Sequence, residues 1–125
     1  MKWIFAILLV CSSLFSDVIA IASDGNNLNS NISSQASRCN YYIFIDKSGN
    51  LLEISQNLNK NIKGGASSKL IDMLNNKKVS HFIASNFGDK LIMSLDSNHI
   101  KYTTYEGKVN TFVKQVVKTT SSSKH

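Results

Sequence analysis

Apolar positions recur along the chain with two different periods, and the period changes near residue 65. Before that point, apolar runs of strand length at 17–23, 41–45 and 51–55 are separated by stretches rich in Asn, Ser and Gly. Asp46-Lys47-Ser48-Gly49-Asn50 lies between the second and third runs and predicts a β-hairpin. The first half is therefore predicted to form three strands, with long loops after the first and the third.

In the second half, segments with helical spacing alternate with short apolar runs. Leu70, Ile71 and Leu74 are spaced as on one face of a helix, which predicts a helix over 66–76. Strands alternating with helices favour parallel pairing through right-handed crossovers, and the hairpin adds an antiparallel edge. The sequence thus predicts one α/β domain with a mixed sheet of about five strands and about three helices. The remaining predicted elements are strands at 79–84 and 99–103, helices at 89–95 and 107–118, and a disordered polar tail at 119–125.

The first sixteen residues have the layout of a secretory signal. Lys2 precedes an apolar run at 3–10, and small and polar residues follow at 11–13. The run is short for a permanent membrane-spanning helix, and an uncleaved N-terminal anchor is the alternative. The chain is therefore expected to be exported to the periplasm and to meet a membrane only through this segment. Ala20-Ile21-Ala22 also resembles a cleavage site, although the same residues are typical of a strand.

Charge and motif content exclude several classes of function. The net charge is +6, and it becomes +5 once Lys2 is removed with the signal. The basic residues are scattered, whereas binding along a phosphate backbone needs them clustered on one face, so no nucleic-acid partner is expected. Asp24 and Asp46 lie at strand ends, but both lie in turns where Asp is common, and no other strand supplies a well-placed acid. With no nucleophile triad and no phosphate loop, no enzymatic activity is expected. His81, within an apolar run, is interpreted as a core or edge histidine rather than a metal ligand.

Four stretches resemble one known family. They are Val18-Ile19-Ala20-Ile21-Ala22-Ser23-Asp24-Gly25, Ile32-Ser33-Ser34-Gln35-Ala36-Ser37-Arg38-Cys39-Asn40-Tyr41-Tyr42, Gly64-Gly65-Ala66 and Ser85-Asn86-Phe87-Gly88. In their order and spacing they are similar to the dinitrogenase iron–molybdenum cofactor biosynthesis domain of NifX-like proteins. The resemblance runs from about 18 to 117 and implies a ribonuclease H-like fold over 17–118. Because residues 18–23 would then be a core strand, signal cleavage is expected near residues 13–16.

The resemblance also implies a function and a site. Family members act as non-catalytic carriers, so the chain is expected to carry or sense a metal–sulfur cluster or a metallocofactor precursor. Cys39 is the candidate metal ligand, because a thiolate suits iron, molybdenum or copper centres, and its pKa is expected to fall beside Arg38. A small buried residue is the alternative reading of Cys39. Backbone N–H groups around two glycines before a helix could hold an anionic cluster, or could simply start that helix. The candidate binding residues are Arg38, Cys39, Gly64, Gly65, Ser85, Asn86 and Gly88.

One departure from the family pattern leaves a second function open. Many members carry a His followed by Phe-Gly where this chain has Gln35-Ala36-Ser37, so a metal-binding imidazole is absent there. One thiol in the mature chain cannot complete a four-thiolate site. A cluster would then be held partly by backbone and charge, or shared between two chains of a homodimer. The alternative function is a metal-free protein-interaction module. The expected partner in either case is a protein, which in the carrier reading donates or receives the metal–sulfur species.

Overall fold

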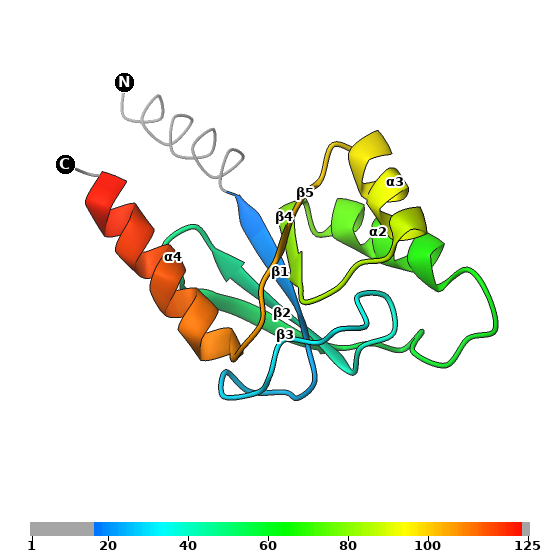
Figure 1. The fold of residues 1–125 in the computed structure, drawn as a ribbon, viewed down its shortest axis with the longest axis horizontal. Coiled ribbons are helices and arrows are strands. Elements are labelled where there is room, and N and C mark those ends of the chain that lie inside the picture. Colours follow the sequence, from blue (N-terminus) through cyan, green and yellow to red (C-terminus); the bar gives the residue numbers. More distant parts are fainter. Residues whose placement is uncertain (1–16, 124–125) are drawn as a thin grey trace, which may run out of the picture.

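The computed structural model describes residues 17–123, so the predicted signal segment lies outside the described residues. Three strands come first, with no helix between them, and helices then alternate with the last two strands. Figure 1 shows the sheet between helices on its two sides. The elements are β1 (Val18–Ser23), β2 (Tyr41–Asp46), β3 (Leu51–Gln56), α2 (Ala66–Asn76), β4 (Val79–Ala84), α3 (Asp89–Ser97), β5 (Lys101–Thr104) and α4 (Val109–Ser123).

The sheet has five strands in the order β3-β2-β1-β4-β5. β1 lies at its centre, antiparallel to β2 and parallel to β4, and β5 continues the parallel half. The three inner strands are apolar and buried along most of their length, whereas the edge strands β3 and β5 are largely exposed. This arrangement confirms the predicted mixed α/β sheet with its antiparallel hairpin edge.

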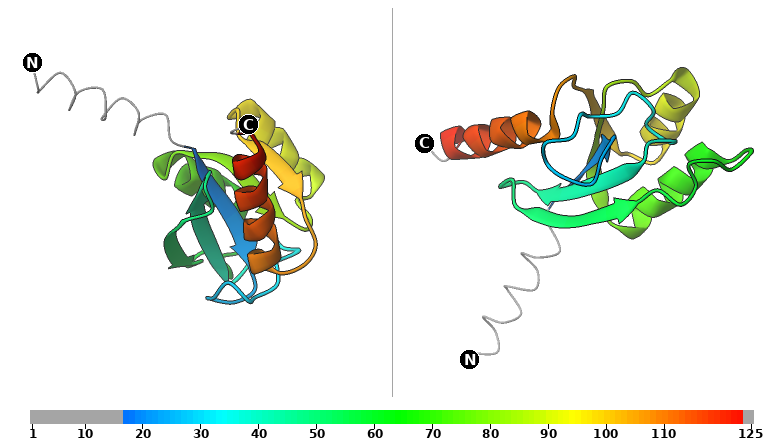
Figure 2. Two further views of the ribbon diagram at one scale, coloured as in Figure 1. Left: turned by 90° about the vertical axis from the view of Figure 1, so that its left-hand side faces the viewer. Right: turned by 90° about the horizontal axis from the view of Figure 1, so that it is seen from below.

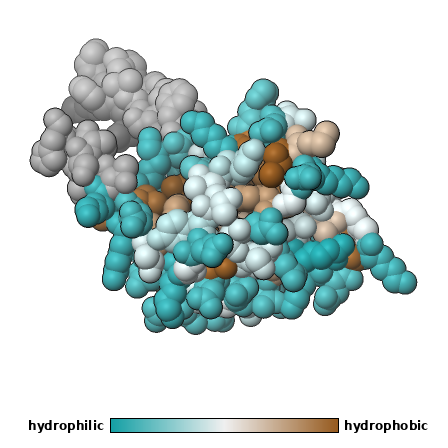
Figure 3. Space-filling view, in the orientation of Figure 1, coloured by the Kyte–Doolittle hydropathy of each residue, from teal (hydrophilic) through white to brown (hydrophobic). Residues whose placement is uncertain are grey.

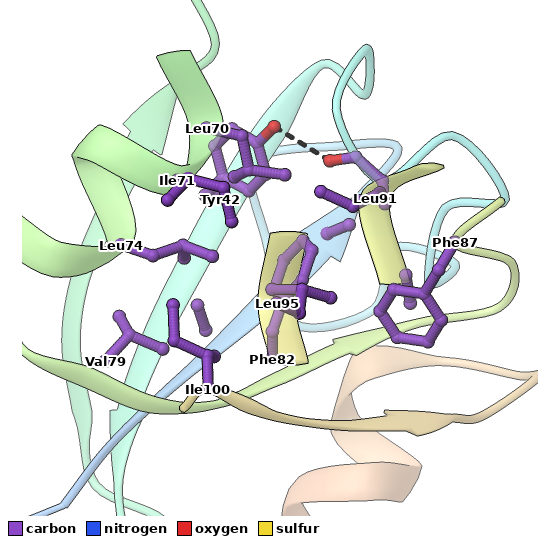
Figure 4. Packing of buried hydrophobic residues seen from close by; sticks show 14 of the residues in the cluster. Tyr42, Leu70, Ile71, Leu74, Val79, Phe82, Phe87, Leu91, Leu95 and Ile100 are labelled. Atoms are coloured by element: carbon purple, nitrogen blue, oxygen red, sulfur yellow. Dashed lines mark hydrogen bonds between the residues drawn. The ribbon is translucent and has the colours of Figure 1, made fainter. Parts of the chain in front are cut away.

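The two faces of the sheet bury separate apolar cores. Because successive side chains of a strand point to opposite faces, Phe44 and Phe82 pack under α2 and α3, whereas Ile43 and Ile83 pack under α4. Figure 2 shows α4 on its own, away from the pair formed by α2 and α3. The core under α2 and α3 is drawn in Figure 4, where Phe82 lies between the leucines of the two helices.

Several element ends differ from the prediction, and two of these differences have a clear physical reason. β5 begins at Lys101, and His99, predicted to open it, lies in the turn that ends α3, with a φ of 59°. There the His99 N–H donates to the Asp96 carbonyl (3.1 Å) and the Ile100 N–H to the Leu95 carbonyl (3.0 Å), a Schellman turn. The other difference is in α4, which continues to Ser123 where a tail was predicted from 119, because no Gly or Pro follows the apolar face to stop the helix.

Candidate functional site

Two loops meet over the carboxyl ends of β1 and β4. The Ser33 N–H donates to the Ala22 carbonyl at the end of β1 (2.8 Å), and the Ser33 carbonyl accepts from the Ser85 N–H after β4 (2.9 Å). The loop before β2 is thereby fixed across this edge of the sheet. In open α/β sheets, the carboxyl ends of parallel strands are where ligands bind.

A pocket of about 380 Å³ lies beside this edge, between the loop before β2 and the first turns of α2 and α3. Two of its lining side chains are basic, Arg38 from the loop and Lys90 from α3, and none is acidic. Such a lining favours a negatively charged ligand. The other lining residues are small or polar: Ser37, Gly64, Gly65, Ala66, Ser67, Ser68 and Ser94.

The start of α2 contributes backbone N–H groups to this pocket. Gly65 is the N-cap residue and has a φ of 78°, a left-handed conformation that glycine adopts without strain. No side chain caps the helix and no acid stands in its first turn. The N–H groups of the first turn thus lie at the pocket with the positive end of the helix dipole, a combination that suits an anion.

Arg38 holds the loop between β3 and α2. Its Nη1 atom donates to the carbonyls of Lys60 (3.1 Å) and Ile62 (2.7 Å). Arg38 therefore both lines the pocket and holds residues 60–62 in place. It makes no hydrogen bond with Cys39, its neighbour in sequence.

Cys39 lies in the core behind the pocket, with 3% of its surface exposed. Its thiol donates to the carbonyl of Tyr41 (3.2 Å) and approaches that of Ala36 (3.8 Å). Burial raises the pKa of Cys39 from 9.0 to about 11, against smaller opposing effects of hydrogen bonds from Tyr42 and from backbone N–H groups. The expectation that Arg38 lowers this pKa is therefore wrong, because desolvation dominates and the guanidinium is directed to other acceptors. Ligation of a metal by Cys39 stays a prediction.

The loop at 85–88 lies next to the pocket without lining it. Ser85 is half-buried, Asn86 and Gly88 are exposed, and Gly88 starts α3 with a φ of 80°. The structure thus brings Arg38, Gly64 and Gly65 together at the pocket, whereas Cys39 and residues 85–88 do not line it. Whether any of these residues binds a cluster stays a prediction.

Lys90 is the charged pocket residue that the sequence did not lead us to expect. It follows the glycine that starts α3 by two positions, at the same edge of the sheet as Arg38. The sequence does place a basic residue in the first turn of a helix, just after a glycine that follows a strand. Without knowledge of the pocket, this pattern is only a weak indication of a binding residue.

The described residues contain no group of three His, Cys, Asp or Glu side chains that could hold a metal ion. His81 is half-buried at the opposite end of the parallel strands, with Nε2 2.6 Å from the Thr103 hydroxyl. Burial and then Lys101 lower the pKa of His81, and Asp17 opposes them. His81 thus lies on the inner strand β4 and is hydrogen-bonded to the edge strand β5.

Asp24 and Asp46 cannot form one catalytic centre. Asp46 pairs with Val18 at the start of β1, whereas Asp24 follows the last residue of β1. The six residues of β1 separate the two carboxylates by a distance on the order of 20 Å. Asp46 instead closes the hairpin turn, where its carboxylate accepts hydrogen bonds from Ser48 and Asn50.

No helix among the described residues has the length and hydropathy that crossing a membrane requires. That finding concerns residues 17–123 alone.

Solved structures with the same fold come from several organisms. The apo form of the orange protein from Desulfovibrio gigas is 19% identical over 82% of this chain and 88% of its own, with a TM-score of 0.73. An NMR structure of a candidate NifB protein from Thermotoga is 29% identical over 85% and 88%, with a TM-score of 0.64. A candidate dinitrogenase from Methanocaldococcus jannaschii is 15% identical over 82% and 92%, with a TM-score of 0.55. The first and last of these identities support the fold alone.

A search of curated proteins finds no significant match. The sequence profile of one family, described as "Dinitrogenase iron-molybdenum cofactor", matches residues 17–122, from before β1 to the last turn of α4. This match covers the whole fold and includes every residue of the pocket. The chain therefore belongs to the dinitrogenase iron–molybdenum cofactor family.

Proposed function

We propose that this protein is a non-catalytic carrier of an anionic metal–sulfur cluster or metallocofactor precursor, bound as cargo in the pocket between α2 and α3. The observation that carries the proposal is the lining of that pocket. It combines Arg38, Lys90 and the N-terminal turn of α2, and it includes no carboxylate among the described residues. Family membership supports a role in cofactor binding or assembly.

The lining supports binding by charge and hydrogen bonds rather than by a full set of metal ligands. No three ligating side chains converge among residues 17–123. A sulfide-rich anion presents acceptors to N–H donors, and each charge-assisted hydrogen bond contributes about 1.5–3 kcal/mol. Arg38, Lys90 and the backbone N–H groups of α2 thus offer an anion donors and positive charge without any metal–ligand bond.

The test uses two probes under anaerobic conditions, tetrathiomolybdate and a reconstitution with iron and sulfide. Wild-type protein is expected to retain at least one of them with charge-transfer absorption. Arg38→Ala and Lys90→Ala are each expected to weaken binding about tenfold, which corresponds to about 1.4 kcal/mol. Lys114→Ala, at an exposed position of α4, removes equal charge outside the pocket lining and serves as the control. Equal loss in all variants, or no uptake by the wild type, would contradict the proposal.

Cys39→Ser separates two versions of the site. If the thiolate is a ligand, its loss should abolish the charge-transfer bands, and binding would then require the core to open. If binding depends on the pocket alone, Cys39→Ser should keep the bands. The mass of the loaded protein tells whether one chain holds the cargo or a homodimer shares it.

The metal-free interaction module remains the alternative function. Gln35 is exposed where many family members carry a histidine, so this chain offers no imidazole at that position. A folded, colourless protein that takes up neither probe would favour this alternative.

We also propose that the protein is exported and processed before β1. A cut after Ala22 would remove all of the central strand except Ser23, whereas a cut near residues 13–16 leaves it intact. N-terminal sequencing of protein recovered from the cell envelope is expected to start between residues 14 and 17. Recovery of the full-length chain from the cytoplasm would contradict both parts of the proposal.

A further inference from the structure

The cargo pocket opens onto a larger surface that carries no negative charge. It shares Ser37 and Ala66 with a depression of about 190 Å³, which in turn shares residues 56–58 with a shallow depression of about 720 Å³. We refer to the three together as the basic face. Among the described residues that line it there is no Asp or Glu, and the basic ones are Arg38, Lys60, Lys69 and Lys90.

An apolar side chain projects from the middle of this face. Leu58 is 83% exposed, more than any other large apolar side chain in the described part of the chain, and it lines both outer depressions. It belongs to the loop at 57–63, the first part of the connection from β3 to α2, which runs outward between them in Figure 1. A lone exposed leucine needs no explanation, but one flanked by depressions and by cations forms a surface suited to binding.

Hydrogen bonds hold this loop in shape. Asn57 is buried, and its Nδ2 atom donates to the carbonyls of Ser37 (3.1 Å) and Cys39 (2.9 Å). Farther along, Arg38 bonds the carbonyls of residues 60 and 62. Leu58 is thus presented by a fixed segment, and a fixed surface loses less conformational entropy when it binds.

Binding of the cargo does not account for all of the positive charge. Lys60, Lys63 and Lys69 are exposed and do not line the cargo pocket. No acidic residue occurs between positions 54 and 71. Elsewhere, Lys77 pairs with Glu53 (2.6 Å). No salt bridge joins the three lysines around the loop to a carboxylate of the described residues, so they are available to a partner.

We propose that the basic face docks an acidic protein, with Leu58 inserted into an apolar contact on it, and that this protein delivers or receives the cargo. The second part rests on the proposed function. A protein fits better than a nucleic acid, because the cations surround an apolar centre and hollows instead of forming a stripe. Figure 3 shows mostly hydrophilic side chains, with small, separate apolar areas, on the side of the molecule that it displays.

The experiment places a photo-crosslinking amino acid at position 58 of the full chain, in the cells that produce it. The control position is Val117, an exposed apolar residue of α4. An acidic protein is expected to crosslink at 58 and not at 117. Lys60→Glu with Lys63→Glu should abolish the crosslink, and Lys114→Glu with Lys118→Glu, an equal change of charge on α4, should leave it.

The captured protein is then purified and its binding measured. The Lys60 and Lys63 charge reversal should slow association at least tenfold at 0.15 M salt, because charge complementarity acts mainly on the association rate. Absence of a crosslink at 58, equal crosslinking at 117, a partner that is not acidic, or an unchanged rate would overturn the docking surface. So would crosslinks to nucleic acid alone.

Failure of this inference is distinguishable from failure of the proposed function. The Lys60 and Lys63 variant should bind the probe that the wild type retains, tetrathiomolybdate or iron with sulfide, within about twofold of wild type. These two side chains lie outside the pocket, where salt screens exposed charges. Cargo binding without docking overturns the inference alone. Docking of an acidic protein by a chain that binds no cargo overturns the proposed function and the delivery role, and leaves the docking surface standing.

Discussion

Among single residues, Cys39 shows how packing changes chemistry. Its thiol lies in a small polar group closed off from water, in which the Tyr42 hydroxyl donates to the Ala36 carbonyl (2.8 Å) and accepts from Asn57 (3.4 Å). A thiolate there would lose its hydration, so the neutral thiol is strongly favoured. At neutral pH the residue is a packed neutral side chain, and its reactivity depends on opening of the core.

This burial predicts a loss of stability at alkaline pH. The folded-state pKa of about 11 is above the ordinary 9.0, so the contribution of the neutral thiol is fully present below pH 9. It is lost as pH rises from about 9 to about 11, by about 2–3 kcal/mol in the free energy of unfolding. Urea unfolding of wild type and Cys39→Ala at several pH values checks this. The difference between the two proteins should shrink over that range, and parallel profiles would contradict the prediction.

Two helices are followed by a residue in the left-handed backbone conformation, which glycine adopts more easily than other residues. α2 is followed by Lys78 with a φ of 58°, and α3 by His99 with a φ of 59°. The left-handed conformation costs a non-glycine residue about 1–2 kcal/mol, and glycine recovers that at the cost of a more flexible unfolded chain. Lys78→Gly and His99→Gly should each raise the free energy of unfolding by about 0.5–1 kcal/mol. Met93→Gly, at an exposed position inside α3, should lower it by about 1 kcal/mol and serves as the control.

The loop at 57–63 depends on one side chain from another loop. Arg38→Ala removes the two hydrogen bonds to the carbonyls of Lys60 and Ile62. Amide hydrogen exchange of the loop should then accelerate about tenfold, since opening becomes easier by about 1.4 kcal/mol. Lys90 lines the same pocket but makes no hydrogen bond with this loop, so exchange of the loop should stay unchanged in Lys90→Ala. Equal exchange in wild type and Arg38→Ala would mean that Asn57 alone holds the loop.

For the whole molecule, the position of β1 decides where the chain can be cut. β1 pairs with β2 on one side and with β4 on the other. Its side chains contribute to both apolar cores. A chain that starts at Asp17 should fold with a cooperative thermal transition, and one that starts at Ser23 should not. Circular dichroism during thermal unfolding measures this. A cooperative transition in the shorter chain would show that β2 and β4 can form the sheet without β1.

The elements could be predicted from the sequence because they depend on local periodicity. The helix at Ala66–Asn76 and the strand at Val79–Ala84 have the predicted bounds. The errors lie at element ends, where a few backbone hydrogen bonds decide the outcome. His99 belongs to a helix-ending turn because the buried Ile100 packs against the core, and that contact is not visible in the local pattern.

By itself, the sequence determined the order of the strands and helices, the mixed sheet and the family, because these follow from periodicity and from short local motifs. Only the tertiary structure decided the site. It brought Arg38 and Lys90, far apart in the chain, to the same pocket, and it moved Cys39 into the core although it adjoins Arg38 in sequence. The physical reason is that the charge, pKa and exposure of a group depend on what surrounds it in space, and folding assembles those surroundings from distant segments.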